Sequence, residues 1–252
     1  MILKLIDFRE HNVVCKTKLF YLISHYDSFA EKSLKSPVIL FLIILTLQSS
    51  YSQTISSSLP PQIDHNGKWL FYLHGAIVQD QGINAVSKDF GPYKYLNILD
   101  SLKSRGFNVI SEARPKDTRP EDWANKVSKQ IDSLIDAKLP PQNITVVGAS
   151  AGAAITMEVA LRLKNSKINY VIMGMCWPDT YKEYEGQELC GNFLSIYESS
   201  DPHGRCNRIF EQKKCGGSFK EIEINTGKSH GFLYQPYKEW VDPLIKWIKD
   251  KK

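Results

Sequence analysis

The feature that most constrains the fold is the alternation of short apolar runs with longer amphipathic segments from residue 68 onward. The apolar runs are rich in β-branched and aromatic residues, as in buried strands, and the amphipathic segments repeat apolar residues at helical spacing. Expected strands cover 68–73, 107–111, 143–147, 168–175, 193–197 and 219–224, and expected helices cover 93–104, 121–138, 151–164, 179–189, 208–213 and a last segment that starts behind Asp242-Pro243. Strands separated by helices predict an α/β protein with a mostly parallel central sheet and helices on both faces.

Composition is consistent with a folded chain that has no nucleic-acid partner. Hydrophobic residues make up 42% of the 252 residues, which is enough for a sizeable core and excludes a disordered or collagen-like chain. The 32 basic and 27 acidic side chains leave a net charge of +5, without a basic cluster. Nucleic-acid binding would need a basic patch or stripe, so we expect none.

The first 52 residues differ from the rest of the chain. An uncharged apolar run at 37–47 follows Lys32 and Lys35 and precedes small polar residues, which is the layout of a secretory signal cleaved after Ser52. The run is shorter than the roughly 20 residues of a membrane-spanning helix; a membrane anchor and a buried helix are the alternatives. We therefore expect an N-terminal extension over 1–52, a linker over 53–66 and a folded domain over 67–252. The protein would be exported to the periplasm or the extracellular space and would touch a membrane only through the extension.

Four of the five cysteines lie in one C-terminal stretch, at Cys176, Cys190, Cys206 and Cys215. An even number in an exported chain favours disulfides, and three pairings are possible. Proximity in the sequence favours Cys176 with Cys190 and Cys206 with Cys215. The spacing lacks the Cys-x-x-Cys and His-x-x-x-His pairs of common zinc sites, so we expect no bound metal.

The pattern that points to chemistry is Gly148-Ala149-Ser150-Ala151-Gly152, between the expected strand 143–147 and the helix that follows. In a Gly-x-Ser-x-Gly turn the serine sits on a sharp strand-to-helix turn, and its small neighbours prevent clashes. The helix N-terminus also favours negative charge that develops there. A tight packing turn is the alternative, but the buried strand before it and the small-residue helix after it indicate that Ser150 is a nucleophile.

A nucleophilic serine needs a base and a carboxylate that orients the base. His230 lies on the loop after the last expected strand, where it can reach the carboxyl edge of the sheet. His74, at the end of the first strand, is the rival base, although its place before a glycine favours a role in ordering the loop. Asp201 follows the strand 193–197 and is the expected carboxylate, with Glu198 and Asp179 as alternatives.

The chain order Ser150, Asp201, His230 resembles the order of the α/β-hydrolase superfamily, and His74-Gly75 resembles that family's first oxyanion loop. The resemblance extends from Lys68 to the C-terminus and implies an α/β-hydrolase type of sheet. It departs from many lipases because the loop after His74 reads Gly-Ala-Ile-Val rather than a glycine-rich sequence. It also lacks an insertion long enough for a large lid, so the chain resembles a small, lidless serine esterase.

The resemblance also implies an oxyanion hole and a reaction. The backbone N–H groups of Ala76 and Ala151 would bind the oxyanion while Ser150 attacks a carbonyl carbon, and water would then release the acyl group. The implied function is hydrolysis of a small-molecule carboxylic ester without a cofactor. A peptidase or amidase with the same residues, and a catalytically silent binding protein, are alternatives because the fold accommodates all three.

Residues around these positions carry weaker expectations. Trp177 follows the strand 168–175 and could line the substrate pocket, or it could be an ordinary core or surface aromatic residue. His203 and Arg205 could contact an anionic substrate, with a solvated loop as the alternative. The cluster Asp201, His203 and Cys206 matches no tetrahedral metal spacing.

Overall fold

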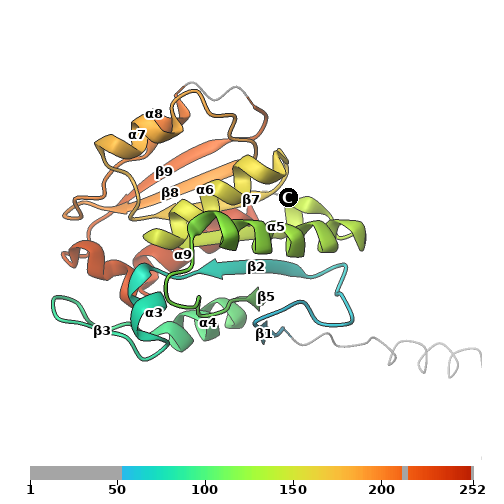
Figure 1. Ribbon diagram of the computed structural model, residues 1–252, viewed down its shortest axis with the longest axis horizontal. Coiled ribbons are helices and arrows are strands. Elements are labelled where there is room, and N and C mark those ends of the chain that lie inside the picture. The colour runs from blue at the N-terminus through green and yellow to red at the C-terminus, as the bar shows by residue number, and fades with distance from the viewer. Residues whose placement is uncertain (1–52, 212–214, 251–252) are drawn as a thin grey trace, which may run out of the picture. The chain divides into compact units, whose positions relative to one another are not determined.

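One parallel sheet organises the part of the chain that the computed structural model describes, residues 53–211 and 215–250. Every neighbouring pair of strands in it is parallel, as predicted for an α/β protein. The strand order is β1 (Ile55–Ser56), β5 (Phe107–Ile110), β2 (Lys68–Leu73), β6 (Ile144–Ala149), β7 (Asn169–Met173), β8 (Asn192–Glu198) and β9 (Phe219–Ile224). Because the strands are parallel, all their carboxyl ends lie at one edge of the sheet (Figure 1).

Helices follow most strands, as the alternating sequence pattern predicts. They are α3 (Ala76–Gln81), α4 (Tyr95–Ser104), α5 (Pro120–Asp136), α6 (Ala151–Leu163), α7 (Pro178–Tyr184), α8 (Asn207–Phe210) and α9 (Lys238–Lys249), with 3₁₀ helices η2 (Pro141–Asn143) and η3 (Ser229–Tyr234). A small antiparallel hairpin, β3 (Val86–Ser87) and β4 (Gly91–Pro92), lies between α3 and α4 in the sequence. In α5, Pro120 occupies the first turn, where its missing N–H costs nothing, and Val127 and Ile131 face the core.

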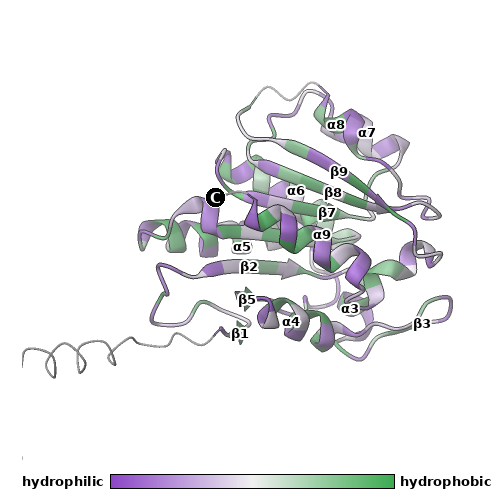
Figure 2. Ribbon diagram, turned by 180° about the vertical axis from the view of Figure 1, so that it is seen from behind, coloured by the Kyte–Doolittle hydropathy of each residue, from purple (hydrophilic) through white to green (hydrophobic). Residues whose placement is uncertain are grey.

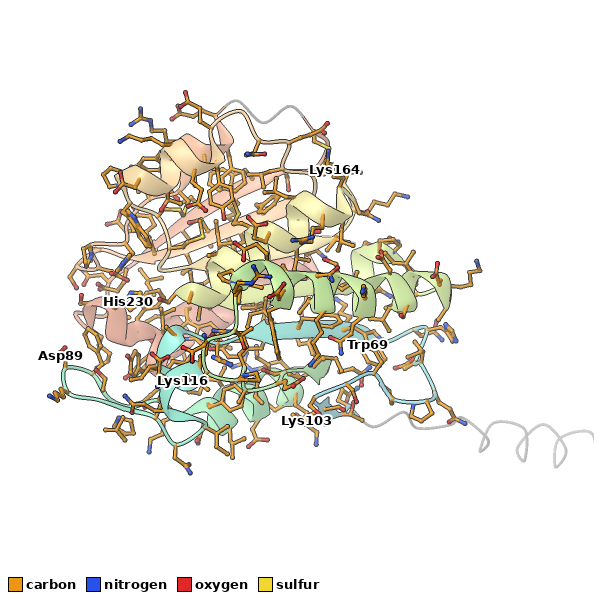
Figure 3. All side chains as sticks on the ribbon, viewed as in Figure 1. Trp69, Asp89, Lys103, Lys116, Lys164 and His230 are labelled. Atoms are coloured by element: carbon orange, nitrogen blue, oxygen red, sulfur yellow. A yellow bond between two sulfur atoms is a disulfide. The ribbon has the colours of Figure 1, made fainter. Side chains whose placement is uncertain are left out.

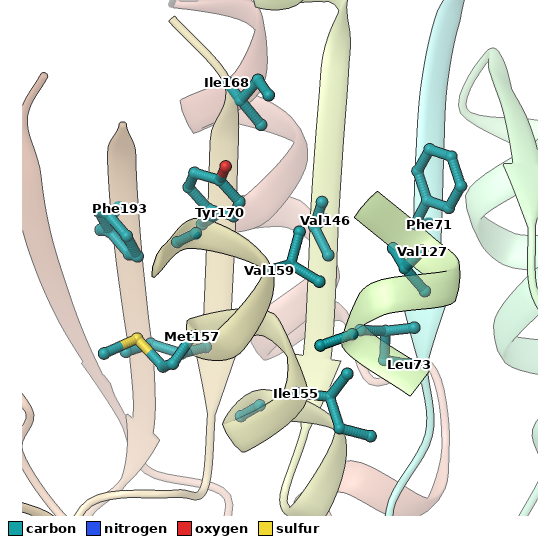
Figure 4. Close-up of a cluster of buried hydrophobic side chains, with 14 of the residues drawn as sticks. Phe71, Leu73, Val127, Val146, Ile155, Met157, Val159, Ile168, Tyr170 and Phe193 are labelled. Carbon is teal, nitrogen blue, oxygen red and sulfur yellow. The ribbon is translucent and has the colours of Figure 1, made fainter. Parts of the chain in front are cut away.

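The core has two layers, one on each face of the sheet. Alternate residues of β2 point to opposite faces, so Phe71 and Leu73 pack in the layer under α5 and α6, and Leu70 and Tyr72 pack in the layer with α4 and α9. Figure 4 shows the first layer, where the side chains of α6 lie over β6, β7 and β8. Figure 2 shows the opposite face, with largely apolar central strands and amphipathic α4 and α9. Burial of each large aliphatic or aromatic side chain stabilises the fold by about 1.5–3 kcal/mol.

Several elements differ from the sequence prediction. The helix predicted over 179–189 ends at Tyr184, and the predicted loop after the first strand includes the β3–β4 hairpin. Ile55 and Ser56, in the predicted linker, form the edge strand β1 beside β5, which is too short to give an apolar run. The predicted loop after the first strand contains α3. The last helix begins at Lys238, before Asp242-Pro243; Pro243 is accommodated inside the helix because the carbonyl it leaves unpaired belongs to exposed Glu239.

The predicted disulfide pairing is wrong. The bonds join Cys176 to Cys206 and Cys190 to Cys215. Cys190 and Cys215 precede β8 and β9, whereas Cys176 and Cys206 follow β7 and β8, so the parallel strands carry the two pairs to opposite edges of the sheet. Cysteines that are close in the sequence therefore lie at opposite edges of the sheet, about the length of a strand apart. For this reason, proximity in the sequence predicts the wrong pairs.

The expected signal segment, including the apolar run at 37–47, lies outside the described residues. Within residues 53–211 and 215–250, no helix has both the length and the apolar character needed to cross a membrane.

Candidate active site

Ser150 lies on a strained turn between β6 and α6. Its backbone has φ 53° and ψ −120°, a conformation that a residue with a side chain rarely adopts and that often marks a functional site. The flanking glycines permit this turn: a Cβ on Gly148 would collide with the carbonyl of Gly152, and one on Gly152 would collide with the carbonyl of Leu73. The Gly-x-Ser-x-Gly pattern therefore has the local geometry that the sequence predicts.

His230, in η3 after β9, and Asp201, in the loop after β8, are brought together. His230 Nδ1 donates to Asp201 Oδ2 at 2.7 Å, and the carboxylate is fully buried while the imidazole is 17% exposed. Since the carboxylate accepts, Nδ1 carries the proton and Nε2 is the basic nitrogen. Burial raises the pKa of Asp201, but hydrogen bonds from His230 and His203 outweigh it and hold the pKa below its usual value. Asp201 is therefore an anion at neutral pH.

Ser150 and His230 each lie next to the end of β7. The Ser150 N–H donates to the carbonyl of Met173 at 2.8 Å, and a Cβ on the next residue, Gly174, would lie 3.0 Å from Cε1 of His230. Among the described residues, no hydrogen bond joins Ser150 Oγ to His230 Nε2. Such bonds are often long in free enzymes and shorten when substrate binds. The serine and the imidazole thus both lie beside residues 173–174, and Figure 3 shows His230 at the carboxyl edge of the sheet.

The two predicted oxyanion donors flank Ser150. Ala151 is the first residue of α6 and Ala76 is the first residue of α3, so neither N–H has a partner inside its own helix. Gly75 brings the second donor close: a Cβ there would lie 3.6 Å from the Cβ of Ser150. Two N–H groups at these positions can face an oxygen bound to the carbon that the serine attacks.

His74 is unsuited to be the base. It is fully buried, its Nδ1 donates to the carbonyl of Gly75 at 2.8 Å, and its Nε2 accepts the N–H of Arg114 at 2.9 Å. Burial and the nearby Arg114 charge lower the pKa of His74 to about 3. Both nitrogens of this neutral imidazole are occupied, so His74 orders the predicted oxyanion loop, residues 74–76, and has no free nitrogen that could take a proton from Ser150.

Arg114 is a site residue that the sequence analysis did not identify. It is 2% exposed, its Nη2 donates to the carbonyls of His74 and Gly75 at 2.6 and 3.4 Å, and its Nε donates to Gln79 at 2.9 Å. In the described part of the chain its Nη1 has no hydrogen-bond partner. Burial lowers the pKa of Arg114 to about 10, so the side chain is still a cation at neutral pH. Its place just after β5, at the carboxyl edge of the sheet, was the signal that could have identified it.

The alternative carboxylates have other partners. Glu198 is fully buried, and its Oε1 accepts the N–H groups of Thr226 and Gly227 at 2.9 and 3.1 Å. Asp179 is exposed and lies 3.5 Å from Lys182. Of the three candidates, Asp201 is the one that contacts His230.

His203 also binds Asp201. Its backbone N–H and its Nδ1 both lie 3.0 Å from Oδ1, and its ring lies between those of His230 and Trp177, with centroids 4.6 and 4.8 Å away. Trp177 is 42% exposed, so it forms an open apolar wall beside the acid loop, residues 199–203. Arg205 points elsewhere and binds Tyr197 and Glu223.

Among the described residues, two groups have ligand atoms within 4.8 Å of one another: Glu188 with Cys190 and Cys215, and Asp201 with His203 and His230. The first cannot bind a metal through its cysteines, because they form a disulfide. Both imidazoles already donate through Nδ1 to the one carboxylate, so hydrogen bonding alone accounts for the arrangement. Cys206, which the sequence analysis considered with Asp201 and His203, is bonded to Cys176 and cannot be a ligand.

The comparisons with known proteins agree with this architecture. No protein-family model matches the chain, and no curated protein matches it. Solved structures do match: a fungal esterase from Rhizomucor miehei has a TM-score of 0.51 and 14% identity over 81% of this chain and 77% of its own. The Francisella virulence factor BioJ has a TM-score of 0.49 and 14% identity over 76% and 79%, and a point variant of Arabidopsis thaliana SOBER1 has 0.49 and 13% over 73% and 99%. The chain has the α/β-hydrolase fold, as its sequence predicts.

Proposed function

We propose that this protein is a serine hydrolase that cleaves a small carboxylic ester through an acyl-enzyme, with Ser150, His230 and Asp201 as the triad. The observation that carries the proposal is the 2.7 Å hydrogen bond from His230 to a buried, ionised Asp201 beside the positive-φ turn of Ser150. An imidazole held in this tautomer can take a proton at Nε2, which is the task of the base in acyl transfer.

The reaction proceeds in two steps. His230 Nε2 takes the Ser150 hydroxyl proton while Oγ attacks the ester carbon, and the N–H groups of Ala76 and Ala151 bind the oxyanion. Protonated His230 then gives the proton to the departing alcohol. Water, activated by His230, releases the acid and restores the serine. Each oxyanion donor contributes on the order of 3 kcal/mol to lowering the barrier.

We assign substrate contact to Trp177. Its exposed indole stands next to His203 and so lies beside the acid loop, at the open side of the site. An aromatic wall there suits the apolar part of a small ester. The ester class is supported by the esterase among the fold neighbours.

We also propose that the protein is exported and that residues 1–52 carry the signal. The two disulfides support this because such bonds persist in oxidising compartments. The N-terminal peptide of the protein recovered from its host tests the proposal. A chain that begins at Gln53 outside the cytoplasm agrees with it, and an intact, intracellular chain contradicts it.

Incubation with a fluorophosphonate probe tests the enzymatic proposal. We expect stoichiometric labelling on Ser150, identified by peptide mass spectrometry, and no labelling of Ser150→Ala. A wild-type protein that stays unlabelled while a control serine hydrolase reacts would favour a silent binding protein. Labelling of Ser150→Ala at the wild-type rate would show that another serine is the nucleophile. A panel of short and long acyl esters, sugar acetates and aminoacyl amides then separates an esterase from an amidase.

A further inference from the structure

A carboxylate is buried where the loops that carry Asp201 and His230 leave the sheet. Glu198 is the last residue of β8 and has no exposed surface. It lies opposite Ile224, the last residue of β9, in the strand register. The acid loop begins one residue after Glu198, and the histidine loop, residues 225–230, begins one residue after Ile224. Glu198 therefore stands at the common base of both loops.

Each carboxylate oxygen of Glu198 binds a different loop. Oε1 accepts the backbone N–H groups of Thr226 and Gly227 in the histidine loop at 2.9 and 3.1 Å. Oε2 accepts the backbone N–H of Ser200 in the acid loop at 2.7 Å and the hydroxyl of the same serine at 2.5 Å. One side chain thus supplies acceptors for four donors from two segments far apart in the sequence.

Ser200 extends this connection to the catalytic residues themselves. Because its hydroxyl proton is donated to Glu198, its Oγ is free to accept, and it takes the N–H of Ser229 at 3.2 Å. Ser229 has φ 48°, a left-handed conformation that needs support from its surroundings, and it directly precedes His230. Ser200 directly precedes Asp201. The hydrogen bonds therefore lock the residue before the acid to the residue before the base.

The charge state of Glu198 suits this arrangement. Burial raises the pKa of Glu198, but the hydrogen bonds from Ser200, Thr226 and Gly227 outweigh it and lower the pKa below its usual value. An ionised carboxylate has only acceptors, and that is the state that can satisfy four donors at once. A glutamine would present its NH₂ group to the N–H of one of the two loops.

We propose that Glu198 is a positioning residue: by holding both loops, it fixes the position of His230 relative to Asp201. The group formed by Glu198, Ser200, Thr226, Gly227 and Ser229 is called the Glu198 clamp below. The proposal deepens the proposed function and rests on it, because the geometry that the clamp holds is that of the acid–base pair. Glu198 touches neither substrate nor the reacting atoms in this account.

Kinetics of Glu198→Gln and Ser200→Ala test the proposal. Ser195→Ala is the matched control: it lies on the same strand, is buried, and its Oγ has no hydrogen-bond partner among the described residues. A displacement of about 1 Å in a catalytic pair can lower turnover on the order of 100-fold. We therefore expect kcat of Glu198→Gln to fall roughly 100-fold with KM changed less than about threefold. Ser200→Ala should show a smaller fall in kcat, and Ser195→Ala should retain the wild-type kcat and KM.

A second readout separates positioning from a loss of folding. The proton shared by His230 and Asp201 gives a low-field imidazole resonance, and the amides of Thr226, Gly227 and Ser229 report protection from hydrogen exchange. We expect Glu198→Gln to melt as a folded protein yet lose the resonance and the protection. A folded Glu198→Gln with wild-type kcat, resonance and protection would overturn the proposal.

Failure of the clamp and failure of the function give different results. If the wild type neither labels nor hydrolyses any ester, the proposed function fails, and the resonance and amide exchange still decide whether Glu198 holds the two loops. If the wild type is active and Glu198→Gln loses activity only in proportion to its unfolded fraction, Glu198 is structural and the proposal fails.

Discussion

The two sides of the proposed active site are held by buried ions of opposite sign. On the oxyanion side, the Arg114 cation binds backbone carbonyls of His74 and Gly75. On the acid–base side, the Glu198 anion binds backbone N–H groups of the acid and histidine loops. Each ion is buried, and each is bound mainly by polar groups of the main chain rather than by an opposite charge.

The sign of each buried ion follows from the groups that its loop must leave without other hydrogen bonds. An oxyanion hole needs unpaired N–H groups, so a cation that engages the carbonyls of its loop leaves the N–H of Ala76 available. The acid–base pair needs fixed side chains, so an anion that engages the N–H groups of its loops fixes the backbone and leaves Asp201 and His230 to each other. Buried charges of either sign require hydrogen bonds to offset desolvation, and here those bonds also orient the loops.

The largest effect is expected on the acid–base side, from Asp201→Asn. The neutral amide cannot stabilise the imidazolium, and its NH₂ group can donate to His230 Nδ1, which places the imidazole proton on Nε2, so kcat should fall about 10⁴-fold. Thermal melting should show a folded protein. A loss of less than about tenfold in steady-state turnover would mean that Asp201 is not the orienting carboxylate.

Arg114→Met gives the corresponding test on the oxyanion side. The carbonyls of His74 and Gly75 lose their donor, and the Ala76 N–H loses its fixed direction. We expect kcat to fall about 10²–10³-fold, the range for loss of one oxyanion donor. Unfolding in urea should show a loss of about 1–3 kcal/mol for the unsatisfied carbonyls.

Arg114→Lys is the control for that change, because it keeps the charge and one donor group. It should recover part of kcat. Wild-type turnover in a folded Arg114→Met would show that Arg114 has no effect on catalysis. Of the two buried ions, only Glu198 could then act on turnover.

A smaller effect is expected at Gly174, which lies between the two sides. An added methyl group would lie 3.0 Å from His230 Cε1, closer than real contacts normally come, so the imidazole must shift. We expect Gly174→Ala to lower kcat roughly tenfold, less than the roughly 100-fold effect of a 1 Å displacement. Gly186→Ala is the control, because it has a similar positive φ but open space around the added carbon. Equal activity of the two variants would show that contact with His230 is irrelevant.

The stability of the two sides should also differ in its dependence on pH. The pKa of His74 is about 3 in the folded protein, against an ordinary value of 6.5. Its contribution to the free energy of unfolding is therefore fully present above pH 6.5 and is lost as the pH falls towards 3. From pH 7 to 5 this amounts to about 2 kcal/mol. The pKa values of Glu198 and Asp201 are lowered from 4.5 and 3.8, so their contribution persists at pH 5 and is lost as pH falls through the lowered pKa values.

Urea unfolding between pH 7 and 5 measures this difference. His74→Asn keeps a donor near the Nδ1 position but does not titrate, so its stability should depend less on pH over that interval. Wild type and His74→Asn with parallel pH dependence would contradict the assignment of His74 as a buried neutral imidazole.

The fold and most of the site could be predicted because they depend on local patterns. The small residues on either side of Ser150 predict its strand-to-helix turn. The alternation of apolar runs with amphipathic segments predicts the sheet. Other features depend on which strand ends meet in space: the pairing of Cys176 with Cys206, the carbonyls near Arg114, and the donors around Glu198. From the sequence, Glu198 is only an alternative to Asp201 as the orienting carboxylate, because nothing adjacent in the sequence shows that two loops converge on its side chain.

A crystal structure of the protein after reaction with a small alkyl fluorophosphonate would place the nucleophile, the oxyanion donors and the base in one view. We expect phosphorus bonded to Ser150 Oγ, one phosphonyl oxygen within about 3 Å of the N–H groups of Ala76 and Ala151, and His230 still hydrogen-bonded to Asp201. Phosphorus on another side chain, or a phosphonyl oxygen turned away from both N–H groups, would contradict it.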